Sequence, residues 1–241
     1  MFALLLSLHT LFGPTPLVPV HYKLVNKSTV DLGMGGMAPI ALTMSAFVSI
    51  TMTDSAEGRV ANVVIDSSTF DAGEMSAAIG DQMGGSPNGV TLRAYFINGK
   101  IQQQITPSTM NLKAKQLAPV IQLLLAGTRT AKPGDAWTDS TVADTAVSAM
   151  TSKASLVTLW KASSGANGTM EFDGTVTGTT TVGGGQIQMD MQTSGTSHAS
   201  RRPGQLPSTA TAATSGAGNM NMGGQSLTMK LSTEMSATLI P

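Results

Sequence analysis

Three histidines, His9, His21 and His198, are the side chains best suited to act as general bases near neutral pH. A serine hydrolase of the nucleophile-elbow type is not expected, because the chain contains no Gly-x-Ser-x-Gly sequence. His9 lies in an apolar N-terminal segment that we expect to be removed, and His21 follows near the start of the mature chain. His198 lies in a Ser/Gly-rich stretch beside Arg201 and Arg202, a context that favours a solvated surface histidine.

Two pairs of carboxylates are spaced so that they could act together. Glu171 and Asp173 share one face of a predicted strand, and Asp135 and Asp139 flank Trp137. General acid–base catalysis needs a carboxylate with a shifted pKa in a cleft. Because Glu171 and Asp173 fall on the polar face of their strand, the pattern favours solvated carboxylates. We therefore predict no catalytic residues and no enzyme.

Methionine is the unusual residue, with 16 in the chain. Met189-x-Met191 and Met220-x-Met222 have the spacing of soft Cu(I) sites. Met189 and Met191 fall on the apolar face of a predicted strand, which favours core residues. Residues 215–224, which carry the second pair, have the composition of a flexible loop. No His/Asp/Glu group has zinc or calcium spacing, so we predict no metal and no cofactor.

The composition excludes several classes of protein. Charged residues make up only 12% of the chain and the formal net charge is zero, so no basic surface is available to bind nucleic acid. The chain has no cysteine, which removes disulfides, thiolate metal sites and the lipid-anchored cysteine of bacterial lipoproteins. Hydrophobic residues make up 41%, enough for a sizeable core.

The first twelve residues are mostly apolar and are followed by Gly13-Pro14. This run has the length of a signal-peptide apolar region and is too short to cross a bilayer as a helix. We expect residues 1–19 to be a signal peptide or its remnant, with a buried first strand as the alternative. Residues 20–241 would then form a single domain in the periplasm or outside a bacterial cell.

Period-two alternation of apolar and polar residues is the dominant pattern. It runs through residues 40–52, 170–182, 187–192 and 227–239, with Thr, Ser and Gln at most polar positions. Strands alternate their side chains between two faces, so the pattern predicts a sheet that is buried on one side and wet on the other. Asn98-Gly99 lies between two such segments and predicts a two-residue antiparallel hairpin.

Two segments break this alternation and predict helices. Residues 71–83 begin with Asp71 and have Glu74 three residues later, which is a capping-box pattern. Residues 108–126 carry an apolar stripe at helical spacing, and Pro119 suggests that this helix begins near that residue.

The order of these elements is similar to the bacterial lipoprotein-carrier fold, the LolA/LolB-like half-barrels and their mycobacterial LppX relatives. The segment Lys132-Pro133-Gly134-Asp135-Ala136-Trp137 also resembles a turn in envelope proteins of similar build. The resemblance covers element order alone and implies a mainly β (α+β) fold. In that fold a long, strongly curved antiparallel sheet, a half-barrel, wraps around two short helices, and its concave apolar face holds acyl chains. This chain departs from the lipoprotein members in lacking the anchoring cysteine.

A methionine-rich apolar face suits variable ligands, because methionine is flexible and polarizable. We therefore expect a non-catalytic exported envelope protein that binds a lipid or other apolar small molecule between the sheet and its helices. The expected lining residues are Met44, Val48, Met52, Met170, Phe172, Met189, Met191, Met229 and Leu231.

Other functions remain open at this point. A structural or self-associating surface protein with a filled core is the main alternative, because Thr-rich strands with little charge protect their edges poorly. A membrane-spanning outer-membrane barrel is not expected, because two Trp and two Tyr are too few for aromatic girdles. An enzyme with its site in loops is the remaining alternative.

Overall fold

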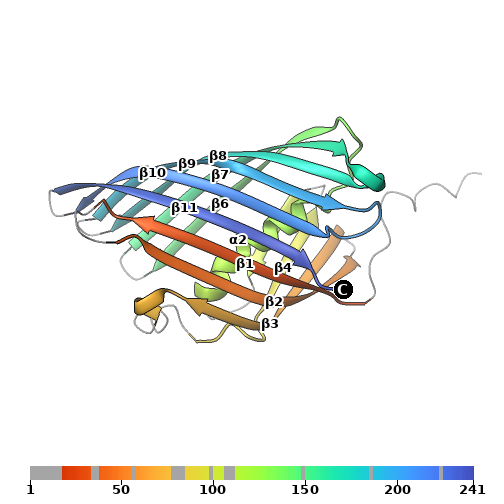
Figure 1. Ribbon diagram of the computed structural model, residues 1–241, viewed down its shortest axis with the longest axis horizontal. Coiled ribbons are helices and arrows are strands. Elements are labelled where there is room, and N and C mark those ends of the chain that lie inside the picture. Colours follow the sequence, from red (N-terminus) through yellow and green to blue (C-terminus); the bar gives the residue numbers. More distant parts are fainter. Residues whose placement is uncertain are drawn as a thin grey trace, which may run out of the picture.

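The computed structural model describes residues 18–33, 38–55, 58–76, 85–97, 100–105, 112–147, 150–184, 187–222 and 225–241. In these residues eleven strands form one antiparallel sheet, in the order β5-β4-β3-β2-β1-β11-β10-β9-β8-β7-β6 (Figure 1). The prediction of a mainly β protein with an antiparallel sheet is therefore confirmed.

The strands are β1 (Val20–Asp31), β2 (Ile40–Ser55), β3 (Gly58–Asp71), β4 (Thr91–Ile97), β5 (Lys100–Ile105), β6 (Ala136–Val147), β7 (Met150–Ser164), β8 (Met170–Gly184), β9 (Ile187–Arg201), β10 (Thr209–Met222) and β11 (Gln225–Leu239). Every pairing joins consecutive strands except that of β1 with β11. That pairing runs from Tyr22↔Leu239 to Asp31↔Lys230 and brings the two ends of the described chain together inside the sheet. The edge strands are β5 and β6, which are consecutive in the chain and joined through helix α2 (Leu112–Ala126).

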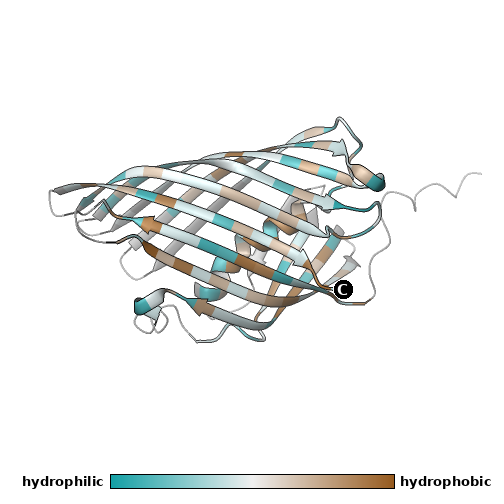
Figure 2. Cartoon of the chain, in the orientation of Figure 1, coloured by the Kyte–Doolittle hydropathy of each residue, from teal (hydrophilic) through white to brown (hydrophobic). Residues whose placement is uncertain are grey.

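The sheet has two chemically different faces. Apolar and polar residues alternate along β11, as Figure 2 shows. On β1 the buried side chains are Tyr22, Leu24 and Asn26, whereas Lys23 and Lys27 are exposed. We call the face that contacts α2 the inner face and the opposite one the outer face. The predicted alternation is thus confirmed.

Helix α2 packs on the inner face and contacts β1, β2, β5, β9, β10 and β11. Its buried stripe consists of Leu117, Val120, Ile121, Leu124 and Leu125, as predicted. The expectation that the helix begins near Pro119 was wrong, because Pro119 lies in its middle. Pro119 is exposed, so the carbonyl four residues earlier, which loses its amide donor, is on the side of the helix that faces solvent.

Small side chains form the floor beneath α2. Residues opposite one another in successive strands form a row across the sheet, and one such row holds five buried alanines with one phenylalanine and one leucine. In strand order its members are Ala162, Phe172, Ala199, Ala210, Ala237, Leu24 and Ala46. We call this row the alanine row. Alanine has no side chain beyond Cβ, so a helix can approach the sheet closely here. At the end of α2, a Cβ on Gly127 would lie only 3.0 Å from that of Ala199.

The second predicted helix, at residues 71–83, is only partly within the described residues. Its described part is a 3₁₀ turn, Gly73–Met75, and residues 77–84 lie outside the description. Asp71 was expected to be the N-cap, but Ala72 holds that position. The reason is that Asp71 still belongs to β3, where it pairs with Thr43. Its carboxylate nevertheless accepts the Gly73 amide at 2.8 Å.

The expected loop at residues 215–224 was also wrong, because residues up to Met222 belong to strand β10. Its small residues give no strong pattern, but β10 pairs with β9 on one side and β11 on the other along its whole length. Asn98-Gly99 lies outside the described residues, although β4 and β5 pair up to Ile97↔Lys100 as a two-residue hairpin requires.

Candidate functional site

All nine predicted lining residues lie on the inner face, but they do not form one group. Met44, Val48, Met52 and Phe172 are buried in the hydrophobic core around α2. Met170 packs against that core and is half-buried.

The remaining four lie farther along the strands. Met191 and Met229 are buried outside the α2 core, while Met189 and Leu231 are half-buried. The structure therefore divides the predicted site between the core and a region beyond the helix.

A row of hydroxyl side chains crosses the inner face between these two regions. Its hydroxyl members are Thr158 on β7, Thr214 on β10, Thr233 on β11 and Ser28 on β1, and we call them the hydroxyl row. All four are half-buried. Ser28 and Thr233 share a hydrogen bond of 3.3 Å between their oxygens. Nothing in the alternation predicted this row, since Thr and Ser are common on both faces.

Two buried polar side chains lie in the adjacent row, beside the alanine row. Asn26 is 5% exposed and donates from Nδ2 to the backbone carbonyl of Gln116 at 2.7 Å, but its Oδ1 has no hydrogen-bond partner in the described residues. Ser197 is 6% exposed and its Oγ also lacks a partner there. Ala212 and Met235 lie between them in the same row. Unpaired polar atoms of this kind are costly in a folded interior.

Glycines and thioethers follow on the other side of the hydroxyl row. Gly216 lies opposite Leu231, and Gly218 lies between Met191 and Met229 in the next row. The sulfur of Met191 is 2.9 Å from the position that a Cβ on Gly216 would take. The Met191 side chain therefore lies over the backbone at Gly216, in the space that a larger residue there would fill.

Met220 joins this group because it pairs directly with Met189. The side chain of Met222 lies outside the description. No cluster of three His, Asp or Glu residues in the described chain could hold a metal ion.

An arginine–aromatic cluster lies where α2 ends. Arg129 contacts the Asp139 carboxylate at 3.3 Å and stands over the ring of Trp137, which itself donates from Nε1 to Asp139 at 3.0 Å. Arg201 stands over Phe172 and donates to the Arg129 carbonyl at 2.8 Å. Desolvation by burial lowers the pKa of the Arg201 guanidinium. Asp139 was expected only to flank Trp137, and the structure makes it the carboxylate of this cluster.

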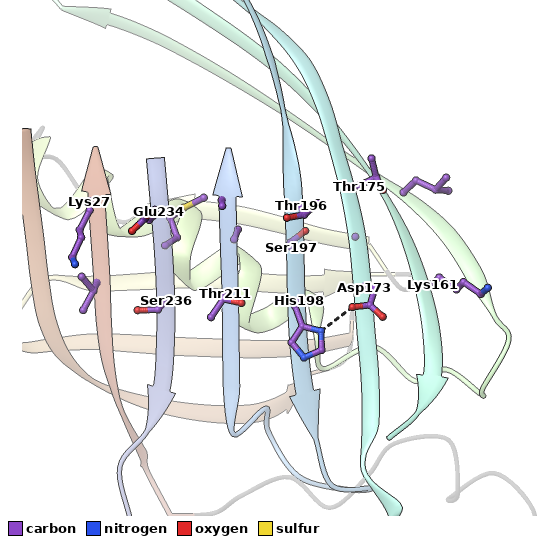
Figure 3. Close-up of a pocket in the computed structure, with 16 residues that line it drawn as sticks. Lys27, Lys161, Asp173, Thr175, Thr196, Ser197, His198, Thr211, Glu234 and Ser236 are labelled. Carbon is purple, nitrogen blue, oxygen red and sulfur yellow. Dashed lines mark hydrogen bonds and ion pairs between the residues drawn. The ribbon is translucent and has the colours of Figure 1, made fainter. Parts of the chain in front are cut away.

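The outer face carries an open hollow of about 900 Å³ over β7–β11 and β1 (Figure 3). In it His198 contacts Asp173 through Nδ1 at 2.8 Å, and through Nε2 it contacts Glu171 at 3.2 Å. His198 is on the surface as predicted, but both ring nitrogens are engaged by carboxylates. Asp173 and His198 come together because they pair across β8 and β9. Their contact was not predicted, because the two residues are far apart in the sequence. Exposed ion pairs of this kind contribute little stability.

A second histidine cluster lies on the same face. Ser49 donates to Asp66 at 2.6 Å, and its oxygen lies 3.1 Å from Nδ1 of His21. This order differs from a catalytic triad, in which histidine lies between the serine and the carboxylate. The His21 and Asp66 side chains are 59% and 42% exposed, so water reaches both of them.

Comparisons with known proteins add no family. No protein-family model and no curated protein matches the chain. Among solved structures, a mutant of Rh. blastica porin is 8% identical, with 90% of this chain and 99% of that chain covered and a TM-score of 0.26. A BenF-like porin from Pseudomonas fluorescens Pf-5 is 7% identical, with 95% and 100% covered and a TM-score of 0.25. Likenesses at these scores carry no argument about fold or function. In the described residues, no helix is both long and apolar enough to span a bilayer.

Proposed function

We propose that this chain is a non-catalytic, exported envelope protein that binds a lipid or similar apolar molecule on the inner face beyond α2. One observation carries the proposal. The alanine row and the stripe of α2 are fully buried against each other, whereas most inner-facing residues beyond the hydroxyl row, including Leu156, Thr193 and Leu231, are only half-buried. An accessible surface of apolar side chains, glycines and a few hydroxyls has the composition of a small-molecule site.

The reach of α2 supports a curved sheet. A helix of 15 residues is about 22 Å long, yet α2 contacts strands from β9 to β5. These two strands are seven positions apart in the sheet, which is about 34 Å if the sheet is flat. A sheet that bends around the helix accounts for both contacts. Such a half-barrel is the shape expected from the resemblance to lipoprotein carriers, although one helix rather than two is described.

Fewer residues are expected to contact the ligand than the sequence predicted. Met44, Val48, Met52 and Phe172 serve as core beneath α2 in this scheme. Met189, Met191, Met229 and Leu231 remain as ligand contacts, joined by Met220. Thioether side chains change rotamer at little cost, so this end can accommodate acyl chains of different length.

Binding to an acyl probe tests the proposal. Native mass spectrometry of gently purified protein is expected to show a 1:1 complex with a co-purified lipid or with added laurate. Leu231→Gln, in the lining, is expected to weaken laurate binding about tenfold, because a polar group replaces buried apolar surface. Phe47→Gln is the control, since Phe47 is 47% exposed on the outer face of β2. Failure of the wild-type protein to bind any acyl probe would overturn the proposal.

Export is a separate part of the proposal. It is supported by the apolar run at residues 1–12, which lies outside the described residues. N-terminal sequencing of the protein recovered from a bacterial envelope fraction is expected to begin near residue 20. Recovery of the intact N-terminus from the cytosolic fraction would argue against export.

Self-association is the second candidate function. Leu159 and Val157 are exposed on the outer face of β7, beside the edge strand β6. Apolar side chains next to a strand edge favour pairing between chains. Light scattering across a concentration series is expected to show dimers that Leu159→Ser dissociates; a strict monomer excludes this function.

A further inference from the structure

The hydroxyl row lies at the border between the buried core and the accessible methionine end. On one side are the alanine row and α2, and on the other are Gly216, Gly218 and the thioethers. From Thr214 to Met220 the strand advances by about 20 Å, which is of the order of one leaflet's thickness of hydrocarbon. This stretch of β10 therefore has the length of a single long acyl chain.

Part of the hydrogen-bonding capacity of this border has no partner among the described residues. Thr158 and Thr214 make no side-chain hydrogen bond in the described residues, and Ser28 and Thr233 bond only each other there. In the adjacent row Asn26 Oδ1 and Ser197 Oγ are both more than nine-tenths buried and unpaired. The partly accessible hydroxyls are thus those of the hydroxyl row, and the unpaired atoms of Asn26 and Ser197 lie buried behind them.

The charge of this surface limits what it can bind. Asp139 is the one charged side chain among the described inner-facing strand residues beyond α2. It lies on β6, opposite Thr158 at the end of the hydroxyl row. That carboxylate is already bonded by Arg129 and Trp137. In the described part of strands β6–β11, β1 and β2, no inner-facing lysine or arginine lies beyond the hydroxyl row to compensate a carboxylate or phosphate head group as it leaves water. Hydroxyls and an amide oxygen complement an uncharged polar group.

We propose that the hydroxyl row, with Asn26 and Ser197 behind it, binds the uncharged hydrogen-bonding head of a single-chain amphiphile, such as a glycerol ester. The acyl chain of this ligand extends from Thr214 toward Met220, along the side chains of Met191, Met229 and Leu231. This inference rests on the proposed function, because it places the head of the ligand that the methionine end accepts.

Three probes that share one chain length test the inference: 1-lauroylglycerol, laurate and dodecane. The wild-type protein is expected to bind 1-lauroylglycerol most tightly. Thr214→Val and Thr233→Val each remove one hydroxyl and keep a β-branched side chain. Each is expected to weaken 1-lauroylglycerol binding about three- to tenfold, as for loss of one hydrogen bond, and to leave dodecane binding unchanged. Thr211→Val is the matched control, because Thr211 is exposed on the outer face of β10.

The possible outcomes separate this inference from the proposed function. Binding of none of the three probes overturns both. Equal binding of dodecane and 1-lauroylglycerol, with no effect of Thr214→Val or Thr233→Val, overturns the head-group subsite and keeps the apolar site. Tighter binding of laurate than of 1-lauroylglycerol also overturns it and moves the head to Arg129 and Arg201. Thermal unfolding followed by circular dichroism verifies that each variant is folded before its affinity is compared.

Discussion

Asn26 on β1 donates a 2.7 Å hydrogen bond from Nδ2 to the backbone carbonyl of Gln116 on α2. It connects the helix to the strand that joins the two halves of the sheet, across 90 positions of sequence. The donor is the side-chain amide of Asn26, which is buried among apolar side chains. A charged group at this position would therefore destabilise the folded state.

We predict that Asn26→Asp is destabilising by about 2–3 kcal/mol at pH 7, because an ionised carboxylate is buried and cannot donate to Gln116. Burial raises the folded-state pKa of the new carboxyl above its unfolded value. The folded state then holds the proton more tightly, so the penalty is absent below about pH 4 and grows as the pH rises. Urea unfolding at pH 4 and pH 7 measures it. Asn26→Leu is the control, and an equal pH dependence of the two variants would contradict the argument.

The alanine row makes a prediction about packing. Ala210→Leu inserts three heavy atoms between β10 and α2, and we expect a loss of about 1–3 kcal/mol in the free energy of unfolding. Ala213→Leu makes the same change on the exposed outer face of the same strand and should change stability by less than about 0.5 kcal/mol. Chemical denaturation compares them. Equal stabilities of the two variants would mean that α2 does not rest on this row.

Gly174 is expected to be intolerant of alanine. A Cβ there would lie 2.5 Å from Ser197 Oγ and 3.0 Å from Cε3 of Trp160. We predict that Gly174→Ala lowers stability by about 1–3 kcal/mol and changes the near-ultraviolet circular dichroism of tryptophan. Adding Ser197→Ala removes the nearest atom and should recover part of the loss. Absence of any recovery would place the strain at Thr158, whose Cγ2 would lie 2.9 Å away, or at Trp160.

The buried Tyr22 phenol predicts instability at alkaline pH. Its hydroxyl donates to the Pro207 carbonyl at 2.7 Å, and burial raises the pKa of Tyr22 well above its ordinary value. Above about pH 10 the unfolded chain releases this proton and the folded chain keeps it. Stability therefore falls as the pH rises, by up to about 1.4 kcal/mol per pH unit from this group.

Tyr22→Phe is expected to cost about 1 kcal/mol at pH 8 and to remove that part of the alkaline decline. Urea unfolding between pH 8 and pH 11 compares the two proteins. If the free energies of unfolding of the two proteins changed in parallel over the whole pH range, Tyr22 would not release its proton on unfolding.

The two faces of the sheet could be predicted because strand alternation is a local property. Each residue's face follows from its own strand, which is why Met44 and Met229, far apart in sequence, were placed together on the inner face. Residues 206–214 were open to interpretation as a strand, but the second half of β10, residues 215–222, escaped this reasoning. Its inner positions include Gly216 and Gly218, which bear too little apolar surface to produce a pattern.

The division of the predicted site could not be read from sequence. It depends on the path of α2, which covers Phe172 and Met44 but not Met191. It also depends on the register of β9, β10 and β11, which places Met191 and Met229 on either side of Gly218. The contact of His198 with Asp173 depends in the same way on the register of β8 and β9. Registers of this kind are settled by pairing between strands rather than within them.

The pairing of β1 with β11 has a mechanical consequence. Its first rung, Tyr22↔Leu239, lies where the described chain enters and leaves the sheet. A pulling force on residues 20 and 240 is therefore perpendicular to the strands and loads one rung at a time. The backbone hydrogen bonds between β1 and β11 then break one pair after another. This requires a lower force than shearing two strands along their length, which breaks all the pairs at once. Opening it separates the sheet into two meanders, residues 20–105 and 136–239, that remain tethered through α2.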